Sequence, residues 1–431
     1  MLQSGQLAGI RRLDLSCGLT HFPPEIYGLA DTLEILNLSG NALESLPDDL
    51  DRLTRLRVIF CSDNLFEEVP DVLGRCPSLE MIGFKANRIS RFPADAIPAA
   101  LRWLILTDNR LEKLPEQLGA CSRLQKLMLA GNRLRNLPDA MACCRNLELL
   151  RISANRFEQL PDWLASLPRL AWLAFSGNPL HANSAAADAC QVHWGDLELQ
   201  HRLGEGASGI IHKALWRAPD GDREVAVKLF KGAVTSDGLP RCEKAACLAA
   251  GVHPNLIAAS GRVCGHPDGV AGLVMPLVGE GYRNLAGPPS LASCTRDIYP
   301  DDARFSLQTL LAMASGVASA AEHLHRIGIM HGDLYAHNLL WNDAGDCLLG
   351  DFGAASFVPQ DAAAFERIEV RAFGCLLEEL LARCDASDRP QATIDMLWEL
   401  QRNCDLPEVA ARPSFSGILQ ALSDMQAIAA R

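Results

Sequence analysis

The chain has 431 residues, 48% of them hydrophobic and 21% charged, and its formal net charge is −12. This length predicts two or three domains. The acidic balance argues against nucleic acid or an anionic membrane surface as a main partner, because both select basic faces. The first residues do not form a charged start followed by an apolar run, and no apolar run of about eighteen residues occurs. We therefore expect a cytoplasmic protein, with export as an effector as the alternative.

The N-terminal part of the sequence is a repeat of 22 or 23 residues. Each copy follows the pattern LxxLxLxxNxLxxLPxxLxxL, and its asparagine recurs as Asn41, Asn64, Asn87, Asn109, Asn132, Asn155 and Asn178. The pattern resembles the leucine-rich repeat. In that repeat the LxL piece is a short parallel strand with inward leucines, and stacked copies bury a core that a single copy cannot bury. We predict an α/β solenoid of about eight repeats over residues 1–180, with Cys61, Cys76, Cys121 and Cys144 in its core.

The residues between the strand leucines should face the concave surface of such a solenoid. They are largely apolar and include two tryptophans: Ile35, Val58, Phe60, Met81, Trp103, Ile105, Met128, Leu149 and Trp172. An exposed apolar stripe with aromatic anchors predicts a face that binds a protein partner or substrate. The alternative is a concave face with scattered apolar residues and no partner. The LPxxL form also resembles intracellular leucine-rich proteins thought to engage small GTPases, so a small GTPase is a partner suggested by resemblance only.

A second pattern begins after the repeats. Residues 181–196 lose the leucine period and are rich in small polar residues, which predicts a linker. Gly204, Gly206 and Gly209 then form GxGxxG, a spacing that lets backbone N–H groups approach phosphates. Dinucleotide-binding folds share this motif, but they need a helix directly after it. Here residues 224–230 alternate as a strand, which favours a phosphate-binding hairpin.

Three further motifs resemble the protein-kinase family: Val225-Ala226-Val227-Lys228, the HGD at 331–333 and the DFG at 351–353. The resemblance implies an α+β two-lobed fold, with the N-lobe over 197–278 and the C-lobe over 279–425. It also implies that Lys228 holds the phosphates of ATP and pairs with Glu243. The implied nucleotide-binding residues are Leu203, Gly204, Gly206, Gly209, Ile211, Ala226, Lys228, Met275, Val278 and Leu340.

The residues around HGD and DFG match the needs of phosphoryl transfer. One carboxylate must orient or deprotonate the acceptor hydroxyl, while a second carboxylate and an amide oxygen hold Mg²⁺. Asn338 follows Asp333 by five residues and Asp351 follows it by eighteen. By resemblance Asp333 is the catalytic base, and Asn338 and Asp351 are the metal ligands. The implied function is a Ser/Thr-type protein kinase that uses ATP and Mg²⁺.

Two substitutions in the catalytic loop depart from the family pattern. Gly332 replaces an arginine that normally pairs with a phosphorylated activation loop. Tyr335 replaces a lysine near the γ-phosphate, and His337 is a candidate substitute for that cation. These departures leave two alternatives open. One is a pseudokinase that acts as an interaction scaffold, and the other is a small-molecule kinase.

The segment after DFG is also unusual. Only fifteen residues separate Gly353 from Glu369, where ordinary protein kinases place a long activation segment ending in APE. Arg412 resembles the arginine that pairs with the APE glutamate, and Glu366 is our predicted replacement partner. Residues 281–304 are an inserted loop without an assigned role. We predict an intracellular, bacterial-type leucine-rich repeat kinase whose solenoid recruits the substrate in place of the missing docking platform.

Overall fold

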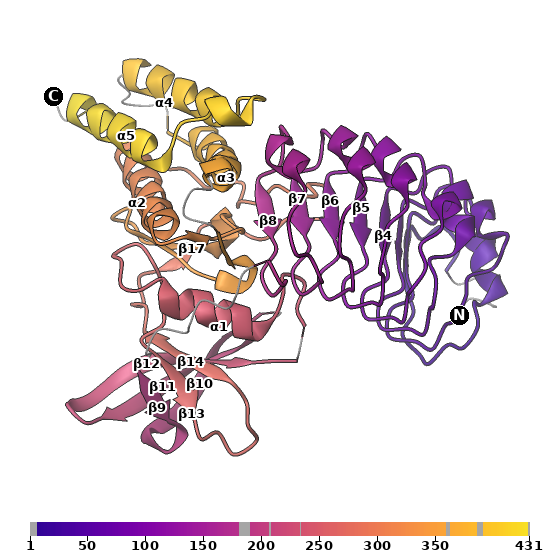
Figure 1. Cartoon of the computed structure of the whole chain (residues 1–431), viewed down its shortest axis with the longest axis horizontal. Helices are drawn as coiled ribbons and strands as arrows, with labels where there is room; N and C mark the ends of the chain where they lie inside the picture. Colours follow the sequence, from indigo (N-terminus) through magenta and orange to yellow (C-terminus); the bar gives the residue numbers. More distant parts are fainter. Residues whose placement is uncertain are drawn as a thin grey trace. The chain divides into compact units, whose positions relative to one another are not determined.

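The computed structural model describes residues 7–180, 190–206, 208–232, 234–358, 363–385 and 391–429. The chain divides into two compact units (Figure 1). The first unit is Met1–Leu167 with Asn178–Leu180, and the second is Pro168–Gly177 with His181–Arg431. The division therefore differs from the predicted boundary at residue 180, because Pro168–Gly177 packs within the second unit.

Short parallel strands form the ladder of the first unit, and each pairs with the next (Figure 1). They are β1 (Arg12–Asp14), β2 (Ile35–Asn37), β3 (Val58–Phe60), β4 (Met81–Gly83), β5 (Trp103–Ile105), β6 (Lys126–Met128) and β7 (Leu149–Arg151). Short 3-10 helices lie on the return path: η1 (Pro24–Leu29), η2 (Leu50–Arg52), η3 (Asp71–Arg75), η4 (Ala94–Ala96), η5 (Glu116–Ala120), η6 (Asp139–Cys143) and η7 (Asp162–Ser166). The inward leucines and the four predicted core cysteines are buried between these layers.

The repeated asparagines hold successive repeats together. The amide nitrogen of Asn132 donates to the carbonyls of Leu106 (2.8 Å) and Leu129 (3.0 Å), and its oxygen accepts from the Leu111 N–H (3.0 Å). Asn109 and Asn155 repeat this pattern. The asparagine is required because its side chain satisfies backbone groups that the turn leaves buried without a ladder partner.

Asn132→Ala is expected to destabilise the repeat unit by roughly 2–4 kcal/mol, because it leaves several buried backbone groups unpaired. Urea unfolding followed by circular dichroism measures this. Asn136 lies on the exposed surface of the same repeat, so Asn136→Ala should change stability by no more than about 0.5 kcal/mol. Equal effects of the two substitutions would contradict the role given to the asparagine ladder.

The second unit contains a six-stranded sheet in the order β10-β11-β12-β14-β13-β9. Its strands are β9 (Gln191–His193), β10 (Leu197–Glu205), β11 (Gly209–Ala218), β12 (Gly221–Phe230), β13 (Gly261–Cys264) and β14 (Gly272–Pro276), with η8 (Trp194–Asp196) and helix α1 (Pro240–Ala249). The apolar residues of the alternating strands, such as Val192, Val225 and Val227, meet in one core. β9 lies inside the predicted linker, whose residues 181–189 are outside the described ranges.

The remainder of the second unit is mainly helical (Figure 1). Its helices are α2 (Leu307–Arg326), α3 (Ala363–Leu381), α4 (Gln391–Cys404) and α5 (Phe415–Ala429), with the short helices η9 (Ala336–Asn338), η10 (Phe352–Ala354) and η11 (Val409–Ala411). Its strands are β15 (Arg283–Asn284), β16 (Ile329–Met330), β17 (Leu339–Trp341), β18 (Cys347–Leu349) and β19 (Ser356–Phe357), and it includes β8 (Trp172–Ala174). Ser306 caps α2 by accepting from the Thr309 N–H at 3.1 Å. Among the described residues, no helix combines the length and hydropathy that crossing a bilayer requires.

Candidate active site

A buried ion pair joins the sheet to α1. Lys228 lies on β12 and Glu243 in the first turn of α1, and their side chains form a salt bridge. The Lys228 ammonium also lies 3.9 Å from the Asp351 carboxylate. Burial disfavours the ammonium form, but the charges of Asp351 and Glu243 outweigh it and raise the pKa of Lys228. The predicted pair is therefore present, with the lysine charged and directed toward the DFG aspartate.

The glycine motif forms the hairpin between β10 and β11. The Gly206 N–H donates to the Gly209 carbonyl at 2.9 Å and closes the turn. A Cβ on Gly209 would lie 2.5 Å from the Leu229 carbonyl, so the strand approaches too closely there for any side chain. The sheet register places Gly204 opposite Ile211 on the neighbouring strand. The three motif glycines therefore lie in one hairpin, with Gly209 packed closely against β12.

The residues predicted to surround adenine come from several elements. Ala226 on β12 lies opposite Met275 on β14, and both are buried. Leu203 is 46% exposed in the glycine hairpin. Val278 follows β14 and Leu340 lies in β17, and both are half-buried. These placements agree with the family pattern, and the assignment of these residues to adenine remains a prediction.

The catalytic loop is fixed by a buried carboxylate. Glu369 on α3 accepts from the backbone N–H groups of His331 (3.2 Å) and Gly332 (2.7 Å), and from His325 Nε2 (2.7 Å). Burial opposes its charge, but these donors lower the pKa of Glu369 below its usual value. His331 Nε2 donates to the Gly350 carbonyl (2.9 Å), so its Nδ1 accepts from the Asp333 N–H (3.3 Å). Glu369 thus fixes the backbone of the catalytic loop from α3.

The three predicted catalytic and metal residues lie close together in the loop system. Asn338 Nδ2 donates to the Asp333 carboxylate at 2.8 Å and to the Asp333 carbonyl at 2.9 Å. Asp351 adopts a left-handed backbone (φ 56°), and its carboxylate accepts from the Gly353 N–H at 3.2 Å. The amide oxygen of Asn338 and the exposed carboxylate of Asp351 are hard oxygen donors, which is the donor set that Mg²⁺ prefers.

A residue that sequence reasoning missed supports this loop. Asp297, in the inserted loop 281–304, accepts from the His337 N–H (2.9 Å) and contacts His337 Nδ1 (2.7 Å). Burial lowers the basicity of the ring, but Asp297, Asp333 and Asp351 together raise the pKa of His337 above its ordinary value. The signal was absent from the sequence because no motif marks Asp297 and forty residues separate it from its partner.

The charge of His337 predicts a pH-dependent stability. A raised folded pKa stabilises the protein fully below the unfolded value of about 6.5, and this contribution is lost as pH rises through the folded pKa. We expect His337→Gln to lower the unfolding midpoint at pH 6 and to have a smaller effect at pH 9. His201 is exposed, so His201→Gln is the matched control. A pH-independent difference for His337→Gln would contradict the assignment.

The predicted exposed stripe is only partly exposed. Ile35, Phe60, Trp103 and Ile105 are half-buried, whereas Val58, Met81, Met128, Leu149 and Trp172 are buried. The expectation of exposure was therefore wrong for five of the nine positions. Trp172 is covered by Tyr335, on which its ring stacks. For the other four the physical reason is that adjacent strands are so close that large side chains cover their neighbours. The Phe60 ring, for example, lies 2.5 Å from where a Cβ on Gly83 would be.

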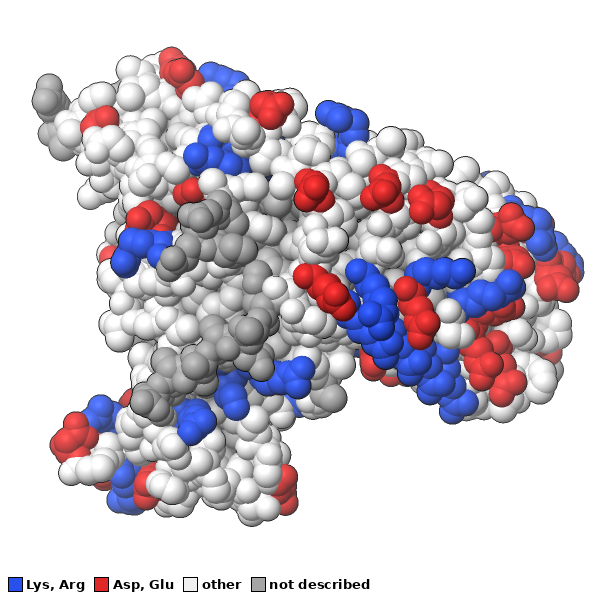
Figure 2. Space-filling view, viewed as in Figure 1, with Lys and Arg blue, Asp and Glu red and all other residues white. Residues whose placement is uncertain are grey.

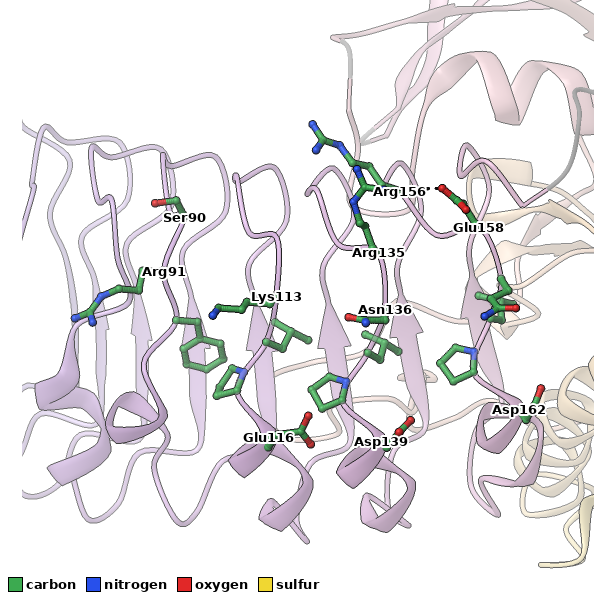
Figure 3. A pocket seen from close by; sticks show the side chains of 18 residues that line it. Ser90, Arg91, Lys113, Glu116, Arg135, Asn136, Asp139, Arg156, Glu158 and Asp162 are labelled. Atoms are coloured by element: carbon green, nitrogen blue, oxygen red, sulfur yellow. Dashed lines mark ion pairs between the residues drawn. The ribbon is translucent and has the colours of Figure 1, made fainter.

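The repeats have a groove away from those strand positions. Its volume is about 1230 Å³, and it is lined by the segments that follow the repeated asparagines. Figure 2 shows Lys and Arg gathered in a band over the repeats, next to Asp and Glu. Around the groove, Arg91, Lys113, Arg135 and Arg156 lie with Glu116, Asp139, Glu158 and Asp162 (Figure 3). Because these charges balance, they select neither an acidic nor a basic partner.

The predicted partner of Arg412 was wrong. Arg412 is buried and donates to the carbonyls of Leu406 (2.9 Å), Arg367 (2.9 Å) and Pro168 (2.7 Å). Glu366 instead accepts from the Phe415 N–H at 2.7 Å and caps α5. Spacing alone did not reveal this, because the carbonyl of Pro168 comes from the repeat sequence, 244 residues away.

A glycine hairpin, a buried Lys–Glu pair beside Asp351, and a loop in which Asp333 bonds Asn338 are features typical of a two-lobed protein-kinase domain. The family model for protein tyrosine and serine/threonine kinases matches residues 197–372. Leucine-rich repeat models match residues 32–53, 99–157 and 122–180. The chain thus combines leucine-rich repeats with a protein kinase domain. Kinases of this family generally use ATP and Mg²⁺.

Two relatives are named as kinases, and one similar solved structure is a leucine-rich repeat protein. The transforming tyrosine-protein kinase Abl of Abelson murine leukemia virus is 25% identical over 281 residues, covering 55% of this chain and 35% of that protein. A probable serine/threonine-protein kinase of Dictyostelium discoideum is 24% identical over 237 residues, covering 50% and 13%. A leucine-rich repeat protein of Leptospira interrogans has 28% identity and a TM-score of 0.39, covering 42% and 46%. The chain spans about a third or less of the length of these kinase relatives.

Proposed function

We propose that this protein transfers the γ-phosphate of ATP to serine or threonine hydroxyls of a protein substrate. The observation that supports this most is the intact set of charged groups. Lys228 pairs with Glu243 beside Asp351, and Asp333 is hydrogen-bonded to Asn338. A domain that had lost catalysis would be expected to lose at least one of these groups.

Each of the proposed site residues has a separate role in this reaction. The glycine hairpin covers the phosphates and offers them backbone N–H groups, while Lys228 neutralises phosphate charge. Asp333 orients the acceptor hydroxyl and takes its proton, and Asn338 holds the Asp333 carboxylate in place. Mg²⁺, held by Asn338 and Asp351, would supply charge neutralisation on the phosphates. His337, which pairs with Asp297, is the candidate substitute for the cation that is missing where Tyr335 replaces the usual lysine.

We further propose that the repeats recruit the substrate protein. The short segment between Gly353 and Glu369 offers little platform for docking a peptide, and leucine-rich repeats generally mediate protein–protein interaction. Holding the substrate near the active site would raise its effective concentration to about the millimolar range. The half-buried residues Ile35, Phe60, Trp103 and Ile105 remain the proposed contact face.

Substituting Phe60 and Ile105 together by serine should raise the apparent KM for the protein substrate without changing the KM for ATP.

One observation favours a second candidate, a nucleotide-binding scaffold: Tyr335 removes a cation from the catalytic loop. Incubation with γ-labelled ATP and Mg²⁺, alone and with a cell lysate, distinguishes the candidates. Label on serine or threonine of a protein supports the proposed kinase. Label on tyrosine would change the acceptor class, and label only on a small metabolite would indicate a small-molecule kinase. Nucleotide binding without any transfer would support the scaffold.

A further inference from the structure

One strand from the repeat sequence is built into the kinase-like unit. We call Pro168–Gly177 the β8 segment, after the strand Trp172–Ala174 at its centre. The Trp172 indole N–H donates to the Leu334 carbonyl at 3.0 Å. Its ring stacks on Tyr335 with centroids 4.2 Å apart and planes 6° from parallel. Both rings are buried, so the tyrosine that replaces the usual lysine forms a packing contact inside the catalytic loop.

The same segment explains why position 332 is glycine. Gly332 has φ +74°, and a Cβ there would lie 2.5 Å from the Leu173 carbonyl and 2.8 Å from the Ala354 carbonyl. Any side chain at this position would displace the β8 segment or the DFG loop. An arginine before the catalytic aspartate is therefore excluded by contact with the segment.

Contacts at both ends hold the β8 segment in place. Arg412 Nη2 donates to the Pro168 carbonyl at 2.7 Å, and Arg371 Nε donates to the Arg169 carbonyl at 3.0 Å. At the other end the Phe175 N–H donates to Ser356 Oγ at 3.1 Å, just after the DFG loop. Two buried guanidiniums thus bind backbone of the segment, and burial lowers the pKa of Arg412 to about 10.

The segment also reaches the helix that holds the ion pair. The Ser176 side chain lies beside the Cys242 thiol, and Cys242 directly precedes Glu243 on α1. One short stretch of chain therefore contacts the catalytic loop, the residue after the DFG turn and α1. These are the parts that must be placed together for phosphoryl transfer.

We infer that the β8 segment is a positioning element of the active site, and that Trp172 and Tyr335 are positioning residues that hold the catalytic loop. The chain between Gly353 and Glu369 has only fifteen residues, and its Ser356 accepts a hydrogen bond from the Phe175 N–H of the segment. The inference rests on the proposed kinase function. Neither Trp172 nor Tyr335 is assigned contact with the reacting atoms.

The test uses the full chain with Trp172→Ala, and Trp163→Ala in η7 as the matched tryptophan control in the repeat unit. Loss of the stack should lower kcat by about 10- to 100-fold, because the reacting groups lose alignment. The Kd for a fluorescent ATP analogue should stay within about twofold, since no residue of the segment is assigned to the nucleotide. An unchanged kcat, or equal losses for both tryptophans, would overturn the inference.

Trp172→Phe keeps a stacking ring but loses the indole N–H, so it should recover most of the kcat and controls for misfolding of the alanine variant. Tyr335→Leu should lower kcat like Trp172→Ala, and the double variant should be no worse than either alone, because both remove one stack. Additive losses would overturn the inference.

If the wild type transfers no phosphate, the proposed function fails, but hydrogen exchange still tests whether the β8 segment holds the catalytic loop. Faster exchange at 331–335 in Trp172→Ala, with β12 unchanged, supports it, and unchanged exchange overturns it.

Discussion

Asp333→Ala is expected to lower the rate of phosphoryl transfer by about 10³-fold or more, with ATP affinity within about twofold of wild type. The Asp333 carboxylate accepts a hydrogen bond from Asn338, and Asp333 is not assigned to binding the nucleotide. Its loss removes the group that orients the acceptor hydroxyl and takes its proton. The Asp333→Ala protein should therefore still bind ATP but transfer little phosphate.

Label transfer from γ-labelled ATP measures the rate, and titration with a fluorescent nucleotide measures the affinity. Asp343 is an exposed aspartate in the turn between β17 and β18, so Asp343→Ala controls for loss of a negative charge in the same lobe. It should keep wild-type transfer. Label that persists in the Asp333→Ala protein would show that another group is the base, and the proposed mechanism would be wrong.

Lys228→Met should have two separate effects. Phosphate anchoring is lost, so kcat/KM for ATP should fall by about 10²–10³-fold. Glu243 is also left buried without its cation, and breaking a buried pair in this way typically destabilises a protein by about 3–5 kcal/mol. With this variant alone, a loss of activity could come from lost phosphate anchoring or from lost stability.

The double variant Lys228→Met with Glu243→Gln separates these effects. Removing the unpaired charge should restore most of the unfolding midpoint, because the buried carboxylate no longer lacks its cation. Transfer should stay as low as in Lys228→Met. Calorimetry and initial rates on the same preparations provide both measurements. If activity returned together with stability, Lys228 would be a structural residue and not a phosphate anchor.

The parts of this protein that follow local rules could be predicted from its sequence. The period of the repeated asparagines predicts the parallel strand ladder. The spacing of Asp333, Asn338 and Asp351 predicts that they meet in one loop system. The Lys228–Glu243 pair follows from a strand and the next helix. Each of these depends on residues that are near in sequence or on a recurring template.

The features that could not be predicted depend on long-range packing. Asp297 meets His337 across an inserted loop that has no pattern, and Trp172 meets Tyr335 across 163 positions of sequence. Trp172 fits the repeat period perfectly well, so its pattern predicted a face of the solenoid. Which surface actually covers a side chain is a property of the assembled fold and leaves no period in the sequence.

The chain path at the β8 segment has a consequence for how such proteins can change. Solenoids usually gain or lose whole repeats, because each copy contacts only its neighbours. Here the strand at 172–174 follows the repeat period but packs on Gly332 and Tyr335. Duplication or deletion of copies upstream of Leu167 should change the KM for the protein substrate but leave kcat unchanged, whereas the last copy cannot be exchanged alone. A graft of this kinase domain onto another array would have to include its own final strand.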